Sequence, residues 1–137
     1  MPKELFAYAK DMKLVVHKTN GRHSTLMLTE EDMGAKGFIV GCHTMDPGGG
    51  ATEHSHKNEQ EAMFFYEGTG IATIDGVEYK IEPESIMLAP AGVPHTIKNT
   101  GSGPLKFVFV YCPPLPEHVS RAEYYSRAQD KIDPPRR

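Results

Sequence analysis

Short runs of β-forming residues, separated by turn signals, follow one another about every eight to twelve residues through most of the chain. Residues 12–18 and 22–28 are two such runs, and they flank Asn20-Gly21, a dipeptide typical of tight hairpins. Residues 105–112, LKFVFVYC, are rich in the valine and aromatic residues that strands favour. This succession of short strands and turns favours an all-β sandwich or barrel.

Length and composition indicate one domain over residues 1–137. Local sequence patterns predict an N-terminal hairpin at 12–28 and a helical C-terminal tail at 117–131 on either side of its core. A net charge of −3 gives no reason to expect a nucleic-acid partner. No apolar run is long enough for a membrane span. The opening MPKELFAYAKDMK does not resemble a secretion signal, so we expect a cytoplasmic protein.

Three histidines and one glutamate occupy positions that a β-fold can bring together. His54 and His56 are one residue apart, so in an extended strand their side chains point the same way. Glu61 begins the strand-like EAMFFYEG, and the polar KNEQ before it is turn-like, so a hairpin returns Glu61 beside the two histidines. His95 lies in a proline-flanked turn and must come from elsewhere in the sheet. Three imidazoles and one carboxylate suit a divalent transition metal.

The segments that carry these residues resemble the two sequence motifs of the cupin family. In the first, the two histidines and Glu61 lie between Gly48 and Gly68 at the family's spacing. The second motif matches from Pro90 onward, with Gly92, His95 and Asn99 in place. Glu84 departs from the pattern, because the family starts this motif with a glycine that serves a turn.

The resemblance covers about residues 37–112 and implies a double-stranded β-helix, or jelly-roll, barrel. It also implies a homodimer, since the family commonly dimerises. The N-terminal strands are candidates to pair across the interface, because a short barrel leaves strand edges that need cover.

The resemblance assigns one divalent metal per chain, Mn, Fe, Ni or Zn, to His54, His56, Glu61 and His95. Glu59 and Gln60 are the competing residues for the acidic ligand, but Glu61 has the better distance to Gly68. Such a site has a net charge of about +1 and attracts carboxylate, enolate or phenolate oxygens. Four protein ligands leave one or two positions open on a five- or six-coordinate ion, where water or a substrate can bind.

Other residues are candidates for the surroundings of the metal. His43 precedes the first motif on a strand and is either a buried structural histidine or a general acid or base. Met63 and Phe65 share the strand parity of Glu61, so we expect them in the cavity wall, and Tyr111 is a further candidate. We interpret the remaining histidines outside the motifs, at positions 17, 23 and 118, as surface or structural residues.

The loops, the C-terminal tail and the cysteines also carry expectations. TEEDMGAKG (29–37) reads as a charged loop, and Ser120 with Glu123 predicts a capped short helix over 120–131. The final DPPRR is expected to be frayed. Cys42 and Cys112 lie in separate apolar runs, so we expect two buried free thiols.

The leading hypothesis is a metal-dependent enzyme that acts on a small organic substrate, chelated through carboxylate, keto or hydroxyl oxygens. The resemblance leaves the reaction open among dioxygenase, isomerase, decarboxylase and lyase, because fold alone decides little. Iron favours dioxygenase chemistry, whereas manganese, nickel or zinc favours isomerisation, hydrolysis or lyase chemistry. The alternative is a non-catalytic, metal-containing module that binds a small ligand such as a sugar acid.

Overall fold

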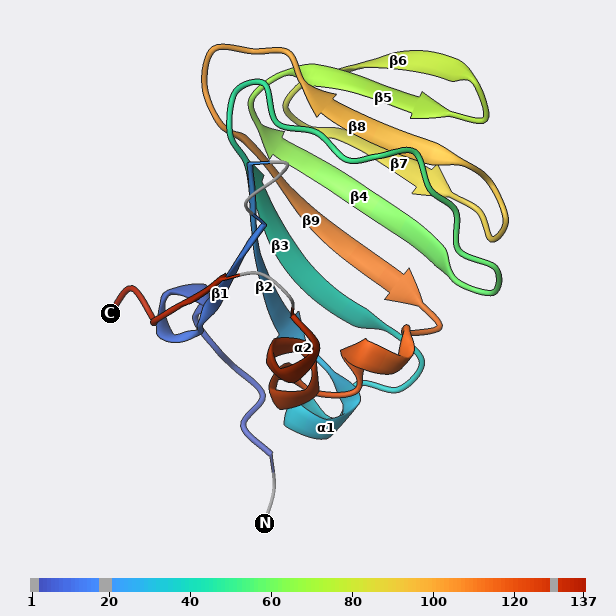
Figure 1. Ribbon diagram of the computed structural model, residues 1–137. Helices are drawn as coiled ribbons and strands as arrows, with labels where there is room; N and C mark the ends of the chain where they lie inside the picture. The colour runs from blue at the N-terminus through green and yellow to red at the C-terminus, as the bar shows by residue number, and fades with distance from the viewer. Residues whose placement is uncertain (1–2, 18–20, 129–130) are drawn as a thin grey trace.

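Two antiparallel β-sheets pack against each other in the computed structural model, which describes residues 3–17, 21–128 and 131–137 (Figure 1). The larger sheet has seven strands in the order β10-β1-β2-β3-β9-β4-β7, and the smaller has three in the order β6-β5-β8. The strands are β1 (Leu14–His17), β2 (Arg22–Leu28), β3 (Ile39–Met45), β4 (Gln60–Glu67), β5 (Gly70–Ile74), β6 (Val77–Ile81), β7 (Ser85–Ala89), β8 (His95–Asn99), β9 (Leu105–Cys112) and β10 (Lys131–Asp133). The prediction of an all-β jelly-roll barrel is confirmed.

Alternate side chains of the large sheet fill the space between the two sheets. On β9, Leu105, Phe107, Phe109 and Tyr111 are each at most 9% exposed, and the residues between them are less buried. β4 lies beside β9 with Tyr111 paired to Glu61, so the two side chains share the inner face. The strand alternation therefore places polar groups inside the barrel at one end of an otherwise apolar core.

The hairpin signals agree with the pairing of the strands. β5 and β6 are joined by Asp75 and Gly76, which both have positive φ angles, 50° and 79°, as a type I′ turn requires. β1 and β2 also pair antiparallel, with His17 opposite Arg22. Asn20 of the predicted Asn-Gly turn lies outside the described residues.

Three motif positions have clear structural roles. Gly68 has a φ of 91°, and a Cβ atom there would lie 2.3 Å from the carbonyl oxygen of Pro104, so only glycine fits. The buried Asn99 amide donates hydrogen bonds to the carbonyls of Met45 and Gly103, both at 2.9 Å. Glu84, at the position where the family has glycine, adopts a left-handed conformation with a φ of 64°.

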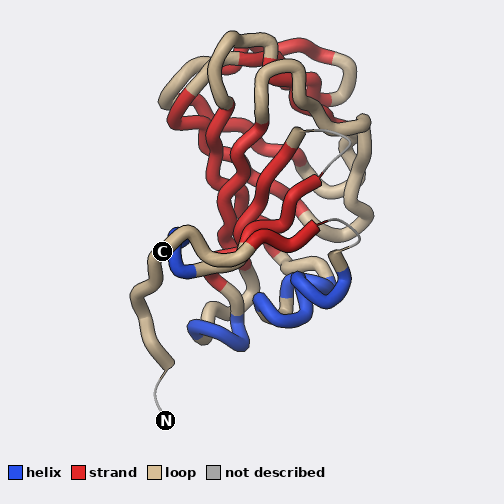
Figure 2. The backbone as a smooth tube through the Cα atoms, turned by 60° about the vertical axis from the view of Figure 1, so that its left-hand side comes forward, coloured by secondary structure: helices blue, strands red, loops and turns tan. Residues whose placement is uncertain are grey.

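The helices gather at one end of the barrel (Figure 2). They are the 3-10 helices η1 (Ala9–Asp11) and η2 (Pro116–His118) and the α-helices α1 (Glu30–Met33) and α2 (Arg121–Arg127). The loop predicted at 29–37 is wrong in part, because the Asp32 N–H donates to the Thr29 hydroxyl and caps α1. Ser120 caps α2 as predicted, accepting from the Glu123 N–H at 2.9 Å. The helix ends at Arg127, short of the predicted range, whose residues 129–130 are outside the described residues.

The C-terminal segment forms a strand that the sequence did not predict. β10 pairs with β1 along residues 131–133, and the Arg137 N–H donates to the Lys10 carbonyl at 3.0 Å, so the expectation of a frayed DPPRR end is wrong. β1 consequently has β2 on one side and β10 on the other. β10 thus occupies the edge that we expected a second chain to cover.

The two cysteines are free, as predicted, but they are less buried than expected. Cys112 is exposed, and Cys42 is partly exposed with its sulfur 3.4 Å from that of Met27. Both lie at outward-facing positions, because Cys112 follows the inward-facing Tyr111 on β9 and Cys42 is paired with Val108, which alternates with the inward-facing Phe107 and Phe109. The apolar sequence runs around the cysteines include residues on both faces of the sheet. An apolar run therefore did not indicate that the cysteines are buried.

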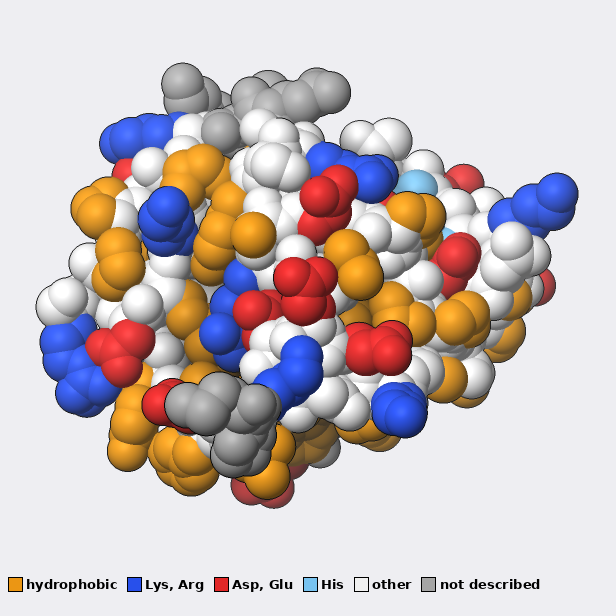
Figure 3. All heavy atoms as spheres, turned by 90° about the horizontal axis from the view of Figure 1, so that it is seen from below, with side chains coloured by type: hydrophobic (Ala, Val, Ile, Leu, Met, Phe, Trp, Pro, Cys, Tyr) orange, Lys and Arg blue, Asp and Glu red, His pale blue; other side chains and the backbone are white. Residues whose placement is uncertain are grey.

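The helical end of the molecule carries charges of both signs. Seen from that side, Lys and Arg side chains lie among Asp and Glu side chains (Figure 3). In the part of the chain that the structure describes, no helix has the length and apolar character needed to cross a membrane.

Candidate metal centre

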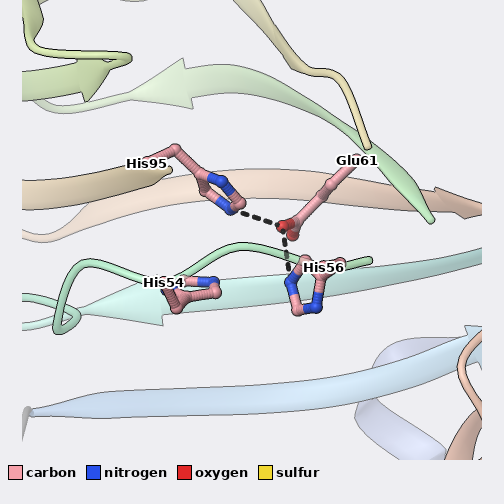
Figure 4. A group of neighbouring side chains, drawn as sticks. All are labelled: His54, His56, Glu61 and His95. Atoms are coloured by element: carbon pink, nitrogen blue, oxygen red, sulfur yellow. Dashed lines mark hydrogen bonds and ion pairs between the residues drawn. The ribbon is translucent and has the colours of Figure 1, made fainter. Parts of the chain in front are cut away.

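Three separate segments bring the four predicted ligands together. Glu61 lies on β4, His95 begins β8, and His54 and His56 lie on the segment between β3 and β4. That segment is held against β8 by an antiparallel bridge, in which the N–H groups of His54 and His95 donate to each other's carbonyls at 3.1 and 2.9 Å. The side chains converge on one point (Figure 4). The predicted grouping of these residues is therefore observed.

The donor atoms of His54, His56, Glu61 and His95 all lie within 4.8 Å of one another. Oε1 of Glu61 is 3.2 Å from Nε2 of His95 and 3.8 Å from Nε2 of His56. Donors about 2.1 Å from a shared ion lie at most about 4.2 Å apart, so only a small contraction is needed. Three imidazoles and one carboxylate at this spacing could hold a transition metal, as is typical of such a ligand set.

Backbone carbonyls orient two of the imidazoles. Nδ1 of His54 lies 2.8 Å from the Thr52 carbonyl oxygen, and Nδ1 of His95 lies 3.1 Å from the Val93 carbonyl oxygen. A carbonyl only accepts, so in each ring Nδ1 carries the proton and the lone pair of Nε2 faces the cluster. Such contacts fix the tautomer and the orientation of metal-binding histidines.

Burial makes the centre unfavourable without a cation. Glu61 is 2% exposed and His95 is 1% exposed. Burial opposes protonation of His95, but hydrogen bonds to Glu61 and to the Val93 carbonyl raise its pKa overall. Burial lowers the pKa of His56 despite the charge of Glu61. A buried carboxylate surrounded by imidazole nitrogens requires a shared proton or metal ion.

Tyr111 extends the centre toward open space. Its hydroxyl lies 3.2 Å from Nε2 of His56, and burial followed by the nearby charge of Glu61 raises its pKa. Tyr111 therefore stays protonated and can donate a hydrogen bond beside the ligands.

Two adjoining cavities lie next to the ligands. An inner one of about 40 Å³ is lined by Glu61, His95 and Met63 among others, and an outer one of about 390 Å³ leads past His54 and His56. Tyr111 and His43 border both. The outer volume lies within the range of pockets that bind small organic molecules.

His43 lies within the cavities and not in the outer layer of the sheet. Its ring packs 5.1 Å from the ring of Phe107 and 4.5 Å from that of Phe109, measured between centroids. Burial lowers the pKa of His43 well below its ordinary value, and the positive charge of Arg22 adds to the shift. Nδ1 has no hydrogen-bond partner among the described residues. His43 is therefore a neutral imidazole whose Nδ1 makes no hydrogen bond with the described residues.

The two other residues predicted for the cavity wall, Met63 and Phe65, lie in different surroundings. Met63 is 5% exposed and lines the inner cavity. Phe65, at 1% exposed, packs against Phe107 with ring centroids 5.2 Å apart. It lies four residues further along β4 than Glu61, where the barrel is closed by core side chains.

Among the outer-cavity residues that sequence reasoning missed are three with titratable or charged side chains, His17, Arg22 and His118. His17 Nε2 lies 3.1 Å from the Ser24 hydroxyl, which in turn is 2.7 Å from the Tyr124 hydroxyl. His118 is 4% exposed and stacks near Tyr111, at 4.9 Å between centroids. The inward parity of 22, 24 and 26 on β2 is a weak signal that could have found Arg22.

Comparison with known proteins adds a family and a set of relatives. The family model described as the cupin domain matches residues 41–111, more than half of the chain. The tetracenomycin polyketide synthase protein TcmJ of Streptomyces glaucescens is 29% identical over 99 residues, which are 71% of this chain and 66% of that protein. A 5-nitrosalicylic acid 1,2-dioxygenase of Bradyrhizobium is 30% identical over 61% of this chain and 44% of its own length. The chain thus spans between about two-fifths and two-thirds of these relatives.

Solved structures share the fold. A predicted oxalate decarboxylase from Thermotoga maritima superposes with a TM-score of 0.71 at 21% identity, over 80% of this chain and 99% of that one. The polyketide cyclase RemF from Streptomyces resistomycificus gives a TM-score of 0.70 at 20% identity, over 85% and 82%. These similarities concern the barrel.

Proposed function

Since the chain belongs to the cupin family, we propose that it is a metal-dependent enzyme acting on a small organic substrate with carboxylate, keto or hydroxyl oxygens. The observation that carries the proposal is the convergence of His54, His56, Glu61 and His95 beside a cavity that also contains His43 and Tyr111. A catalytic site of this kind needs metal-binding residues and a further titratable group near them, and both are present here.

The four clustered residues are proposed to hold one divalent transition metal per chain. When bound, the ion supplies Lewis acidity to a substrate oxygen or lowers the pKa of a bound water. The fit rests on the 4.8 Å spacing of the donors and on the carbonyl contacts that orient His54 and His95. The choice among Mn, Fe, Ni and Zn depends on availability as well as on these ligands.

The residues around the ligands have proposed roles of their own. Tyr111 donates a hydrogen bond to a substrate oxygen, because its hydroxyl is next to His56 and stays protonated. His43 acts as general acid or base, because the neutral imidazole can accept a proton at one nitrogen. Met63 forms an apolar wall of the inner cavity.

The relatives support the substrate class and leave the reaction open. Their names include a 5-nitrosalicylic acid 1,2-dioxygenase, an oxalate-binding protein and a polyketide cyclase, and the first two names contain organic acids. Dioxygenase, isomerase, decarboxylase and lyase chemistry all remain compatible with the ligand set.

The alternative is a metal-containing module that binds a small acid without turning it over. It is favoured by the Thermotoga maritima oxalate-binding protein, which is 27% identical over 61% of this chain. The position of His43 within the cavities favours catalysis, because a binding module needs only hydrogen-bond donors there.

Metal content, measured by elemental mass spectrometry on protein purified without an affinity tag, is the first test. We expect about one ion per chain, and a loss of the ion in His54→Ala and His95→Ala. The identity of the ion then selects the assay, oxygen uptake for iron and isomerase or lyase screens for the others. His43→Gln should keep the metal and lose turnover. Protein that cannot be loaded with any of the four metals contradicts the proposal.

We also propose a homodimer, with an interface different from the one expected from the sequence. The outer faces of β4 and β7 expose Phe64, Ile86 and Leu88, at 41%, 72% and 51%. Phe64 lies opposite Ile86, and Ala62 opposite Leu88, so the apolar groups form one continuous surface.

A further inference from the structure

Arg22 is the only Lys or Arg among the described residues that line either the inner or the outer cavity. It borders the inner cavity together with the ligands Glu61 and His95, and the outer cavity together with His54 and His56. Arg22 therefore lies where the two spaces meet, next to the metal-binding residues and outside the ligand set.

The strand register explains how an arginine reaches this position. Arg22 begins β2 and lies opposite Met45 of β3, whose side chain is completely buried. Ser24 and Leu26, with the same parity on β2, are also completely buried. Arg22 thus points to the inner face, and its charge acts on the pKa values of both His43 and Tyr111.

The charges around the cavities favour an anion at this end. The carboxylates that line them are Glu61, which belongs to the ligands, and Glu117 on η2 in the outer cavity, where it acts on His118. A divalent ion and Arg22 together carry more positive charge than these two carboxylates neutralise. Arginine also presents a planar fork of donors that matches a carboxylate, which allows two parallel hydrogen bonds.

The walls of the outer cavity favour a flat molecule. They include the rings of Phe109, Tyr111, Tyr124, His43 and His118. A volume of about 390 Å³ holds one substituted ring or a conjugated chain of similar size. Aromatic and imidazole faces interact best with planar, polarizable groups.

We propose that Arg22 is the specificity-determining residue for a planar, conjugated organic acid, whose carboxylate or phenolate it binds while the other oxygens of the acid face the metal ligands. This assignment deepens the proposed function. It rests on that function only for the oxygens of the acid that face the metal ligands. The contact between Arg22 and the anion requires no metal.

The test compares an anion with its neutral analogue. Salicylate and salicylamide have nearly the same shape and differ in charge. The ratio of their dissociation constants therefore measures how much the negative charge of the ligand contributes to binding. Isothermal titration calorimetry measures the ratio for the parent, Arg22→Gln and Arg22→Lys, each with its metal and after treatment with EDTA. Arg127→Gln on α2 is the matched control, since Arg127 pairs with Glu123 outside the cavities.

We expect the parent and Arg127→Gln to bind salicylate at least about tenfold more tightly than salicylamide with the metal bound. After EDTA the ratio should be smaller but still lowered by Arg22→Gln, because Arg22 alone then faces the carboxylates of Glu61 and Glu117. Arg22→Gln should bring the ratio close to one, and Arg22→Lys should give an intermediate value, because a lysine keeps the charge and loses the fork. If Arg22→Gln does not fold, as judged by circular dichroism, Arg22→Lys provides the comparison.

A ratio in the Arg22 variants equal to that of the parent overturns the assignment, as does a lack of saturable salicylate binding to the parent. The metal measurement separates this result from a failure of the proposed function. A protein that binds no metal but shows the Arg22-dependent preference loses the enzyme proposal and keeps the anion subsite. A protein that binds metal but shows no Arg22-dependent preference keeps the enzyme proposal and loses the anion subsite.

Discussion

Nε2 of His95 lies 3.2 Å from Oε1 of Glu61, although the Val93 carbonyl holds the proton of that imidazole on the opposite nitrogen. Both facing atoms are then acceptors, buried at 1% and 2% exposure of their residues. Two lone pairs so close together in the interior are unfavourable unless a cation lies between them. The site therefore needs a proton or a metal ion at this point, in agreement with the raised pKa of His95.

Binding of a divalent metal should stabilise the folded chain. At a free metal concentration 100 times the dissociation constant, the free energy of unfolding rises by about 2.7 kcal/mol. Glu61→Gln should lose this increment, because the neutral amide is a poorer ligand. Thermal unfolding with and without added Mn²⁺ or Zn²⁺ measures the effect. Glu59→Gln, two residues away and outside the cluster, should retain it.

The backbone at Glu84 should accept glycine with a gain in stability. A φ of 64° costs a non-glycine residue about 1–2 kcal/mol, part of which is offset by the greater freedom of glycine in the unfolded chain. We expect Glu84→Gly to raise the free energy of unfolding by about 0.5–1 kcal/mol in urea denaturation. Glu82→Gly, where φ is not positive, should lower it by a similar amount. A loss of stability in Glu84→Gly would mean that the Glu84 side chain has an unrecognised contact.

The metal ligands could be predicted from the sequence because they depend on short-range relations. His54 and His56 are related by strand parity and Glu61 by a short turn, and the second motif supplies His95. Arg22 and His118 could not be assigned to the cavity in this way. Arg22 needs the register of β2 against β3, and His118 needs the docking of η2 on Tyr111. Both depend on tertiary packing.

The same reason explains the errors at the chain ends. β10 has three residues followed by two prolines, so it carries almost no local strand signal and forms because β1 offers an unpaired edge. Thr29 forms a cap for α1 through Asp32, a relation that the charged character of residues 29–37 obscured. The composition of this segment indicates a polar surface, but it does not show the capping hydrogen bond that starts the helix.

The apolar surface on β4 and β7 predicts the effect of a charge on assembly. A lysine in place of Ile86, which is 72% exposed, should convert a dimer into monomers, because burying its charge in an interface is costly. Light scattering coupled to size-exclusion chromatography gives the mass directly. Val77→Lys is the control, since Val77 is 52% exposed on β6 of the other sheet and should leave the mass unchanged. A monomeric parent, or dissociation by Val77→Lys alone, contradicts this interface.

The buried histidine of the cavities should make stability depend on pH. Burial, assisted by Arg22, holds the pKa of His43 well below 6.5, the ordinary value of histidine. Between these two pKa values the unfolded chain binds more protons than the folded one, so the free energy of unfolding falls as pH decreases below about 6.5. The stabilisation from a neutral His43 is complete above that pH and is lost as the pH falls toward the folded-state pKa. Urea denaturation of metal-free protein between about pH 5 and 7.5 measures the slope.

His43→Gln should reduce that slope, because glutamine keeps a polar group in the cavity and does not titrate. The slope should persist in part, since burial also lowers the pKa of His118 and of His56, while the raised pKa of His95 contributes with the opposite sign. His23→Gln, the same replacement outside the cavities, is the control for the substitution itself. If His43→Gln and the parent have the same pH dependence, folding does not shift the pKa of His43. That result would contradict the buried, neutral imidazole from which the proposed role of His43 is argued.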